Sequence, residues 1–117
     1  MGKIKIGIVG TGNIGTDLLY KIQKSRNLEC EIFAGRNIDS KGIRIAKNMG
    51  VQTTTDSIEY IDDHPSCCDI IFDATSASFH QKVYDVAKKH NMFSIDLTPS
   101  QIGKMCIPAI NLESCLD

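Results

Sequence analysis

Three glycines are the residues of this 117-residue chain whose spacing points most directly to chemistry. Gly10, Gly12 and Gly15 form the pattern G-x-G-x-x-G. They follow a short apolar run, residues 4–9, which has the length of a buried strand. In residues 14–22, which begin just before the last glycine, apolar side chains recur at helical spacing. The predicted order is therefore strand, glycine turn and helix.

A glycine turn between a strand and a helix can bind the pyrophosphate of a dinucleotide. The first glycine makes the tight turn, the second lets the backbone approach the pyrophosphate, and the third lets the helix pack close to the strand. The unpaired N–H groups and the positive end of the helix then face the phosphates. We predict a dinucleotide site here, with a purely structural glycine turn as the alternative. The residues of this site are Gly10, Thr11, Gly12, Asn13, Ile14 and Gly15.

The end of the second predicted strand, residues 30–35, bears on which dinucleotide is bound. An acidic residue at this place binds the 2′-hydroxyl of NAD, whereas an arginine can accommodate the 2′-phosphate of NADP. The chain has Arg36 and Asn37 here, and Asp39 comes only later. Arg36 is predicted to contact the cofactor, which leaves NADP open beside NAD. A solvated surface arginine is the alternative.

Small residues follow the fourth predicted strand, residues 69–75. In a parallel sheet of this kind, the carboxyl ends of the first and fourth strands flank the crevice where the ligand lies. We predict that Thr75, Ser76 and Ala77 face the ribose and the nicotinamide, where their small size leaves room. A plain helix N-cap would have the same composition.

Strands alternate with helices along the whole chain, which predicts an α/β fold. We expect a single Rossmann-type domain over residues 1–117, with a doubly wound parallel sheet and a central first strand. The predicted strands are 4–9, 30–35, 51–55, 69–75 and 93–97, with an extended piece at 106–110. The predicted helices are 13–24, 40–49, 56–61, 78–90 and one turn at 98–101. Capping boxes are expected at Asp56 with Glu59, Ser78 with Gln81, and Thr98 with Gln101.

The composition argues against several classes of function. Thirteen basic and fourteen acidic residues leave no positive excess to attract nucleic acid. No apolar run is long enough to cross a membrane. The five cysteines show no zinc-ligand spacing and follow no export signal, so we predict reduced thiols in a cytoplasmic protein without a metal site.

Four motifs, in order along the chain, resemble acylating acetaldehyde dehydrogenase. They are Gly-Thr-Gly-Asn-Ile-Gly-Thr-Asp-Leu (10–18), Phe-Asp-Ala-Thr-Ser-Ala (72–77) with His80, Ile-Asp-Leu-Thr-Pro (95–99) and Ile-Pro-Ala-Ile-Asn-Leu-Glu (107–113). The resemblance implies an enzyme of aromatic hydrocarbon catabolism that converts acetaldehyde, NAD and coenzyme A to acetyl-CoA and NADH. It also implies 4-hydroxy-2-oxovalerate aldolase as a partner and contacts of residues 11–14 with the cofactor. Asp73, Asp96 and Thr98 are expected at strand ends beside the crevice, without a catalytic role.

By the same resemblance, the nucleophilic cysteine lies outside this chain. In the family it follows the Asn-Leu-Glu segment in a Cys-Gly-Gly context, and a second domain carries most of the acyl-transfer site. Cys106 and Cys115 do not match that context, so no catalytic residue is assigned. The chain is therefore predicted to be a NAD-binding domain that is inactive alone, as a truncated product or a fragment. An apolar surface toward a second domain would favour self-association into a homo-oligomer.

Two other functions stay open on the sequence. The chain could be a non-catalytic module that binds or senses NAD(H), because this fold hosts many functions. It could also be a coenzyme A-binding domain of the ligase type, which has a glycine turn after its first strand.

Overall fold

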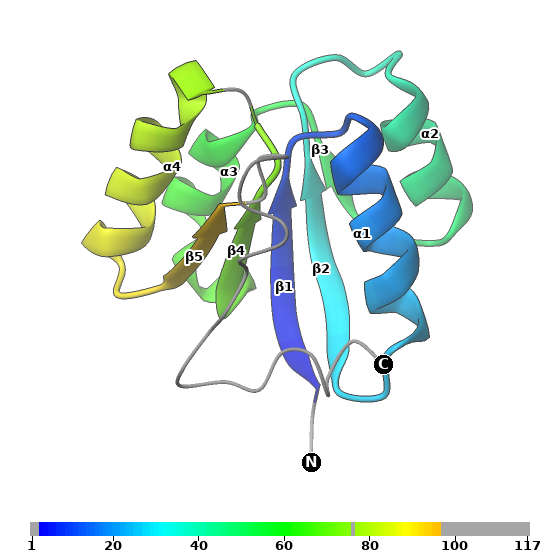
Figure 1. Ribbon diagram of the computed structural model, residues 1–117, viewed down its shortest axis with the longest axis horizontal. Helices are drawn as coiled ribbons and strands as arrows, with labels where there is room; N and C mark the ends of the chain where they lie inside the picture. Colours follow the sequence, from blue (N-terminus) through cyan, green and yellow to red (C-terminus); the bar gives the residue numbers. More distant parts are fainter. Residues whose placement is uncertain (1–2, 76, 97–117) are drawn as a thin grey trace.

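A computed structural model describes residues 3–75 and 77–96 of the chain. Within these residues, five parallel strands form one sheet in the order β3-β2-β1-β4-β5 (Figure 1). The strands are β1 (Ile4–Val9), β2 (Leu28–Ala34), β3 (Thr53–Thr54), β4 (Ile70–Asp73) and β5 (Phe93–Asp96). The helices are α1 (Asn13–Lys24), α2 (Lys41–Asn48), α3 (Ile58–Asp63) and α4 (Ala77–Lys89), with a 3₁₀ turn at Pro65–Cys67. The predicted parallel sheet and its central first strand are confirmed.

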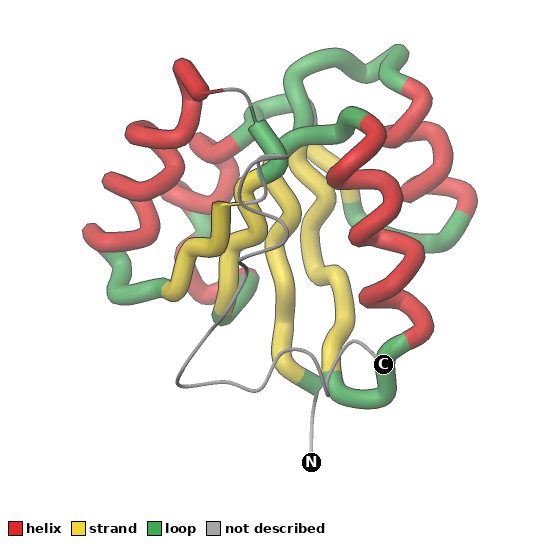
Figure 2. The backbone as a smooth tube through the Cα atoms, viewed as in Figure 1, coloured by secondary structure: helices red, strands yellow, loops and turns green. Residues whose placement is uncertain are grey.

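The helices cover the sheet in two pairs. α1 and α2 lie on one face, and α3 and α4 lie on the other (Figures 1 and 2). Side chains of β1 enter both cores, since Ile6 and Ile8 pack under α1 and α2 while Val9 packs under α3 and α4. A sheet covered on both faces needs apolar residues at nearly every position of its central strands. This requirement explains the apolar second half of β1 and the apolar residues 70–72 of β4.

The bounds of α1 and the turns after α2 and α4 follow from the residues that stand there. α1 spans residues 13–24 as expected, and Leu18, Leu19 and Ile22 on its inner face are buried. Gly50 follows α2 with a φ of +80°, and Asn91 follows α4 with a φ of +57°. Both residue types tolerate this left-handed backbone, so the chain can turn back toward the next strand.

Two of the predicted capping boxes are wrong. The residue before α3 is Ser57 rather than Asp56, because the Ser57 N–H donates to the carbonyl of Gly35 at 3.0 Å and fixes the turn one residue later. The Ser57 side chain makes no capping hydrogen bond. α4 already begins at Ala77, so Ser78 stands inside the helix. The Gln81 amide donates to Asp85 at 2.8 Å instead of returning to the helix start.

The strands differ from the prediction mainly in length. β2 begins at Leu28, which is fully buried, and β3 shrinks to two residues beside the end of β2. The predicted helical turn at 98–101, with Thr98, and the extended piece at 106–110 lie outside the described residues. No helix in the described part of the chain is long and apolar enough to cross a membrane.

Ion pairs join α4 to α3 on the outer side of the sheet. Lys82 pairs with Glu59, and Asp62 accepts from Lys89 at 3.0 Å and contacts His90 Nε2 at 2.9 Å. Since these groups are exposed in part, each pair contributes little to stability. These pairs help to hold α4 in place, and the first turn of α4 borders the site described next.

Candidate functional site

The glycine turn lies where the ends of three strands meet. Gly10 has a φ of +106°, and its N–H donates to the carbonyl of Ala34, the last residue of β2, at 2.8 Å. A Cβ on Gly10 would lie 2.5 Å from the carbonyl oxygen of Ala74, just after β4. A Cβ on Gly15 would lie 2.1 Å from the carbonyl oxygen of Gly10. Both positions therefore require glycine, since no backbone atom can yield that much space.

Gly12 differs from the other two glycines because the fold does not need it. A Cβ at this position would meet no atom within 4 Å, and its φ of −78° is open to any residue. Its lack of a side chain keeps the surface of the turn open toward the outside. This is the arrangement that close approach of a pyrophosphate requires.

The N-terminus of α1 leaves its backbone N–H groups without side-chain caps. Its N-cap is Gly12, which has no side chain, and its first turn holds no acidic residue. α2 is capped in the ordinary way, since the Ser40 hydroxyl accepts from the Ile43 N–H at 3.1 Å. The uncapped, partly positive end of α1 is suited to an anion. The turn and α1 thus fit the phosphates of a dinucleotide.

A pocket of about 430 Å³ opens beside the glycine turn. It lies at the carboxyl ends of β1, β2 and β4, where parallel sheets of this kind bind ligands. Its lining residues are Gly10, Thr11, Gly35, Arg36, Asn37, Ser57, Ala74, Thr75 and Phe79.

The structure brings only part of the predicted set into this pocket. Gly12 and Asn13 are exposed at the adjoining turn and do not line it, and Gly15 is buried against the turn. The side chain of Ile14 packs on the core under α1, so only its backbone faces the predicted phosphate site. Ser76 and the side chain of Ala77 lie outside the described residues.

Arg36 is exposed, yet its side chain has a defined partner. Its guanidinium carbon lies 4.4 Å from the centre of the Phe79 ring, which places a cation over the aromatic face. Arg36 is thus a surface arginine that packs on an aromatic ring at the pocket, and its contact with the cofactor stays a prediction. The partner of Arg36, Phe79, has the helical spacing of Val83 and Val86, which are buried. It stands in the first turn of α4, is only half-buried and forms a wall of the pocket.

An Arg36→Ala substitution should weaken binding of NADPH about tenfold and of NADH about twofold. Only NADPH carries a 2′-phosphate to which the guanidinium can donate charge-assisted hydrogen bonds. Fluorescence titration of the parent chain and the variant with both nucleotides measures the ratio. Arg26→Ala, an exposed arginine outside the pocket, serves as the control. Equal losses for the two nucleotides would show that Arg36 does not read the 2′ position.

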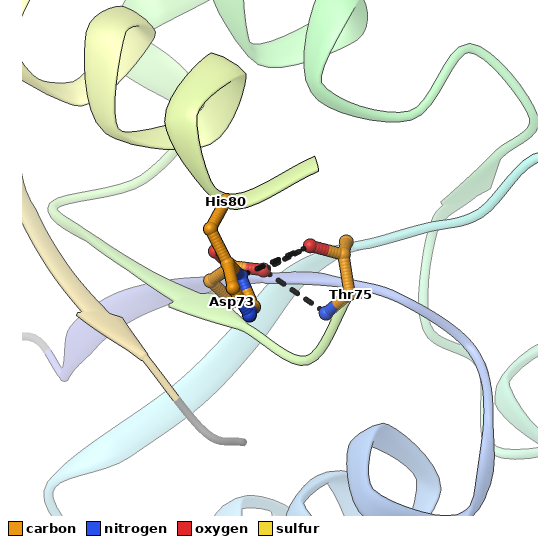
Figure 3. Close-up of polar contacts among 3 residues, drawn as sticks. All are labelled: Asp73, Thr75 and His80. Atoms are coloured by element: carbon orange, nitrogen blue, oxygen red, sulfur yellow. Dashed lines mark hydrogen bonds and ion pairs between the residues drawn. The ribbon is translucent and has the colours of Figure 1, made fainter. Parts of the chain in front are cut away.

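The buried carboxylate of Asp73 connects the residues at another wall of the pocket. Asp73, the last residue of β4, is 2% exposed. Its Oδ1 accepts from the Thr75 N–H at 2.9 Å and from the Thr75 hydroxyl, and its Oδ2 lies 2.7 Å from His80 Nδ1 (Figure 3). One side chain thus joins the end of β4, the loop after it and the first turn of α4.

The sequence reading assigned no role to Asp73 and did not pair it with His80. One sequence feature could have revealed this cluster: an aspartate ends an apolar strand, a threonine follows two residues later, and a histidine stands on the next helix. His80 Nε2 is buried, so the ring does not present that nitrogen to the pocket. The cluster positions Thr75 and the first turn of α4 at the pocket.

None of the three described cysteines has the setting of a nucleophile. Burial raises the pKa of Cys30 to about 12, and it also raises the pKa values of Cys67 and Cys68. A thiol with a raised pKa stays protonated and attacks slowly. No described cysteine lines the pocket at the glycine turn. Cys106, Cys115 and Asp96's side chain lie outside the described part of the structure.

Comparisons with known proteins agree with this geometry. The family model described as semialdehyde dehydrogenase, NAD binding domain, matches residues 5–112. An acetaldehyde dehydrogenase of Pectobacterium atrosepticum is 47% identical over 97% of this chain, which covers 38% of that protein. Acetaldehyde dehydrogenase 2 of Salinispora arenicola is 48% identical over 97% of the chain and 39% of its own length. The chain therefore spans somewhat under two fifths of these curated relatives.

Solved structures share the fold at low sequence identity. A myo-inositol dehydrogenase from Corynebacterium glutamicum gives a TM-score of 0.71 at 21% identity, over 81% of this chain and 28% of that one. An oxidoreductase from Agrobacterium radiobacter, solved in complex with NAD+, L-tartaric acid and magnesium, gives a TM-score of 0.70 at 17% identity. That match covers 84% of this chain and 28% of the oxidoreductase chain. The Rossmann-type fold is confirmed by these neighbours. The family description names NAD, which confirms the predicted cofactor.

Proposed function

Because the chain belongs to the family of semialdehyde dehydrogenase NAD-binding domains, we propose that it is the cofactor domain of an acylating acetaldehyde dehydrogenase. The observation that carries this proposal is the identity of 47–48%, over 97% of the chain, to proteins named acetaldehyde dehydrogenase. The reaction oxidises acetaldehyde with NAD and transfers the acyl group to coenzyme A, giving acetyl-CoA and NADH.

We propose that each part of NAD contacts a different part of the pocket and of the adjoining glycine turn. Backbone N–H groups of residues 10–15 at the start of α1 bind the pyrophosphate. Arg36 and the Phe79 ring border the adenosine, where they supply a cation and an apolar face. Thr75, Ser76 and Ala77 border the nicotinamide half, and Asp73 fixes Thr75 there. When bound, NAD supplies the hydride acceptor.

By the family resemblance, none of the five cysteines of this chain is proposed as the nucleophile of the reaction. Attack on an aldehyde needs a thiolate about 3–3.5 Å from the carbonyl carbon, with the hydride acceptor aligned on the same centre. The described thiols are buried or half-buried, have raised pKa values and do not line the pocket. In this proposal the described residues bind and orient the cofactor, and they do not form the thiohemiacetal.

The purified 117-residue chain should therefore produce no NADH above background from acetaldehyde, NAD and coenzyme A. Absorbance at the NADH band measures the rate, and a full-length relative provides the positive control. Steady NADH production that disappears in Cys106→Ala or Cys115→Ala would overturn this part of the proposal. It would show that the chain carries its own nucleophile.

Titration with NADH and with coenzyme A separates the proposal from its alternatives. Binding of NADH in the pocket supports it. Binding of coenzyme A with no binding of NADH would favour the ligase-type domain. NADH binding by a natural full-length protein that has no dehydrogenase activity would favour a non-catalytic NAD module.

The remaining parts of the proposal come from the family resemblance. They are a cytoplasmic location, a role in aromatic hydrocarbon catabolism, 4-hydroxy-2-oxovalerate aldolase as the partner that supplies acetaldehyde, and self-association. Several large apolar side chains are exposed in the described part of the chain and could support such contacts. They are Tyr20, Ile38, Tyr84 and Phe93.

A further inference from the structure

Thr11 is enclosed by the loop that joins β2 to α2. The Ser40 hydroxyl donates to Thr11 Oγ1 at 3.1 Å. The same Ser40 oxygen accepts from the Ile43 N–H at 3.1 Å, as the cap of α2. A hydroxyl has a single hydrogen, so Ser40 gives its only donor to Thr11. The glycine turn is thereby joined to the start of α2.

Two glycines let the loop and α2 approach Thr11 this closely. A Cβ on Gly35 would lie 2.6 Å from Thr11 Cγ2 and 2.8 Å from Thr11 Oγ1. A Cβ on Gly42 would lie 2.3 Å from the carbonyl oxygen of Thr11. Both distances are shorter than real Cβ contacts, so each site accepts only glycine without movement of its neighbours. Thr11 is thus held from the end of β2 and from the first turn of α2.

The loop between these glycines is itself fixed. Asn37 Oδ1 accepts from the Asp39 N–H at 2.9 Å, and the Asn37 carbonyl accepts from the Ser40 N–H at 3.0 Å. The Arg44 guanidinium donates to the Asp39 carbonyl at 2.9 Å. These bonds restrain the segment that leads from Arg36 to Ser40, so a contact at Ser40 also restrains where Arg36 lies.

We infer that Thr11 is a positioning residue that sets the phosphate-binding turn and Arg36 relative to each other. The inference rests on the proposed binding of NAD in this pocket. The turn and Arg36 border the pyrophosphate and adenosine parts of the site, and a dinucleotide must contact both at once. The Thr11–Ser40 contact fixes the separation of the turn and Arg36 before the ligand arrives. The conformational entropy lost on binding is therefore smaller. In this inference the Thr11 hydroxyl acts through the loop, while the Thr11 backbone belongs to the proposed phosphate site.

A double-mutant cycle on NADPH affinity tests this coupling, because Arg36→Ala is expected to weaken that nucleotide about tenfold. Thr11→Val keeps the shape of the side chain and removes the hydroxyl, and it should weaken NADPH about tenfold. Thr11→Ser retains the hydroxyl and should bind NADPH within about twofold of the parent chain. Arg36→Ala in the Thr11→Val background should cost nearly nothing further, because the arginine has already lost its position.

Arg26→Ala provides the matched control, since this exposed arginine lies outside the pocket and its loop. Its effect should be the same in the parent and in Thr11→Val. Thermal melting should show that Thr11→Val stays folded, and a variant that is unfolded during the titration would overturn a role confined to positioning. Absence of NADH binding by the parent chain would overturn the proposed function together with this inference. Binding by the parent with multiplicative losses for Thr11→Val and Arg36→Ala would overturn this inference alone.

Discussion

A Gly12→Val substitution should abolish measurable NADH binding and leave the fold intact. The new Cβ would meet no atom of the chain within 4 Å, and the backbone at Gly12 is in a region that valine adopts readily. The side chain would therefore occupy the open surface on which the pyrophosphate is proposed to bind. A loss of at least about a hundredfold in affinity, about 2.7 kcal/mol, is expected. Titration by NADH fluorescence enhancement measures it.

Gly15→Val provides the contrasting variant. Its Cβ would lie 2.1 Å from a backbone oxygen, so it should lower the melting temperature as well as the affinity. Gly12→Val should melt like the parent chain. If Gly12→Val binds NADH as tightly as the parent, the pyrophosphate does not lie at this turn.

Replacing Asp73 by alanine should destabilise the fold by about 2–4 kcal/mol. The substitution removes the acceptor for the Thr75 N–H, for the Thr75 hydroxyl and for His80 Nδ1, all at a buried position. Asp73→Asn should cost less, because its amide oxygen can still accept from Thr75. Urea unfolding monitored by circular dichroism gives the free energy of unfolding for each variant.

Asp69→Ala is the matched control for this cluster. Asp69 is exposed, and its carboxylate accepts from the Lys5 N–H at 3.1 Å. Loss of one exposed hydrogen bond should cost less than about 1 kcal/mol. If Asp73→Ala is as stable as Asp69→Ala, the buried carboxylate does not hold this wall of the pocket.

The parts of the fold that local sequence determines could be predicted. α1 matched its predicted bounds because Leu18, Leu19 and Ile22 repeat at helical spacing and are buried on one side. The glycine turn was also predictable, since positive φ and close packing leave glycine as the only choice at Gly10 and Gly15. Periodicity and steric exclusion act over a few residues, so a single sequence is enough to reveal them.

The site details that depend on distant elements could not be predicted. Phe79 has the spacing of a core residue, and only the position of the first turn of α4 makes it a pocket wall under Arg36. The N-cap of α3 is Ser57 rather than Asp56, and the Ser57 N–H is held by the carbonyl of Gly35, which follows β2. In both cases the deciding contact joins residues far apart in the chain, and no local pattern records it.

The central place of β1 has a consequence for the route by which the chain folds. Ile6 pairs with Cys30 on one side and with Ile70 on the other, so the second pairing closes a much longer loop. Loop-closure entropy makes the longer closure costlier by roughly 1 kcal/mol. β1 and β2 can therefore associate, with α1 between them, as soon as they are synthesised on the ribosome. The edge of β1 that later pairs with β4 keeps its backbone N–H and C=O groups unpaired during this interval, and a nascent chain can pair wrongly there.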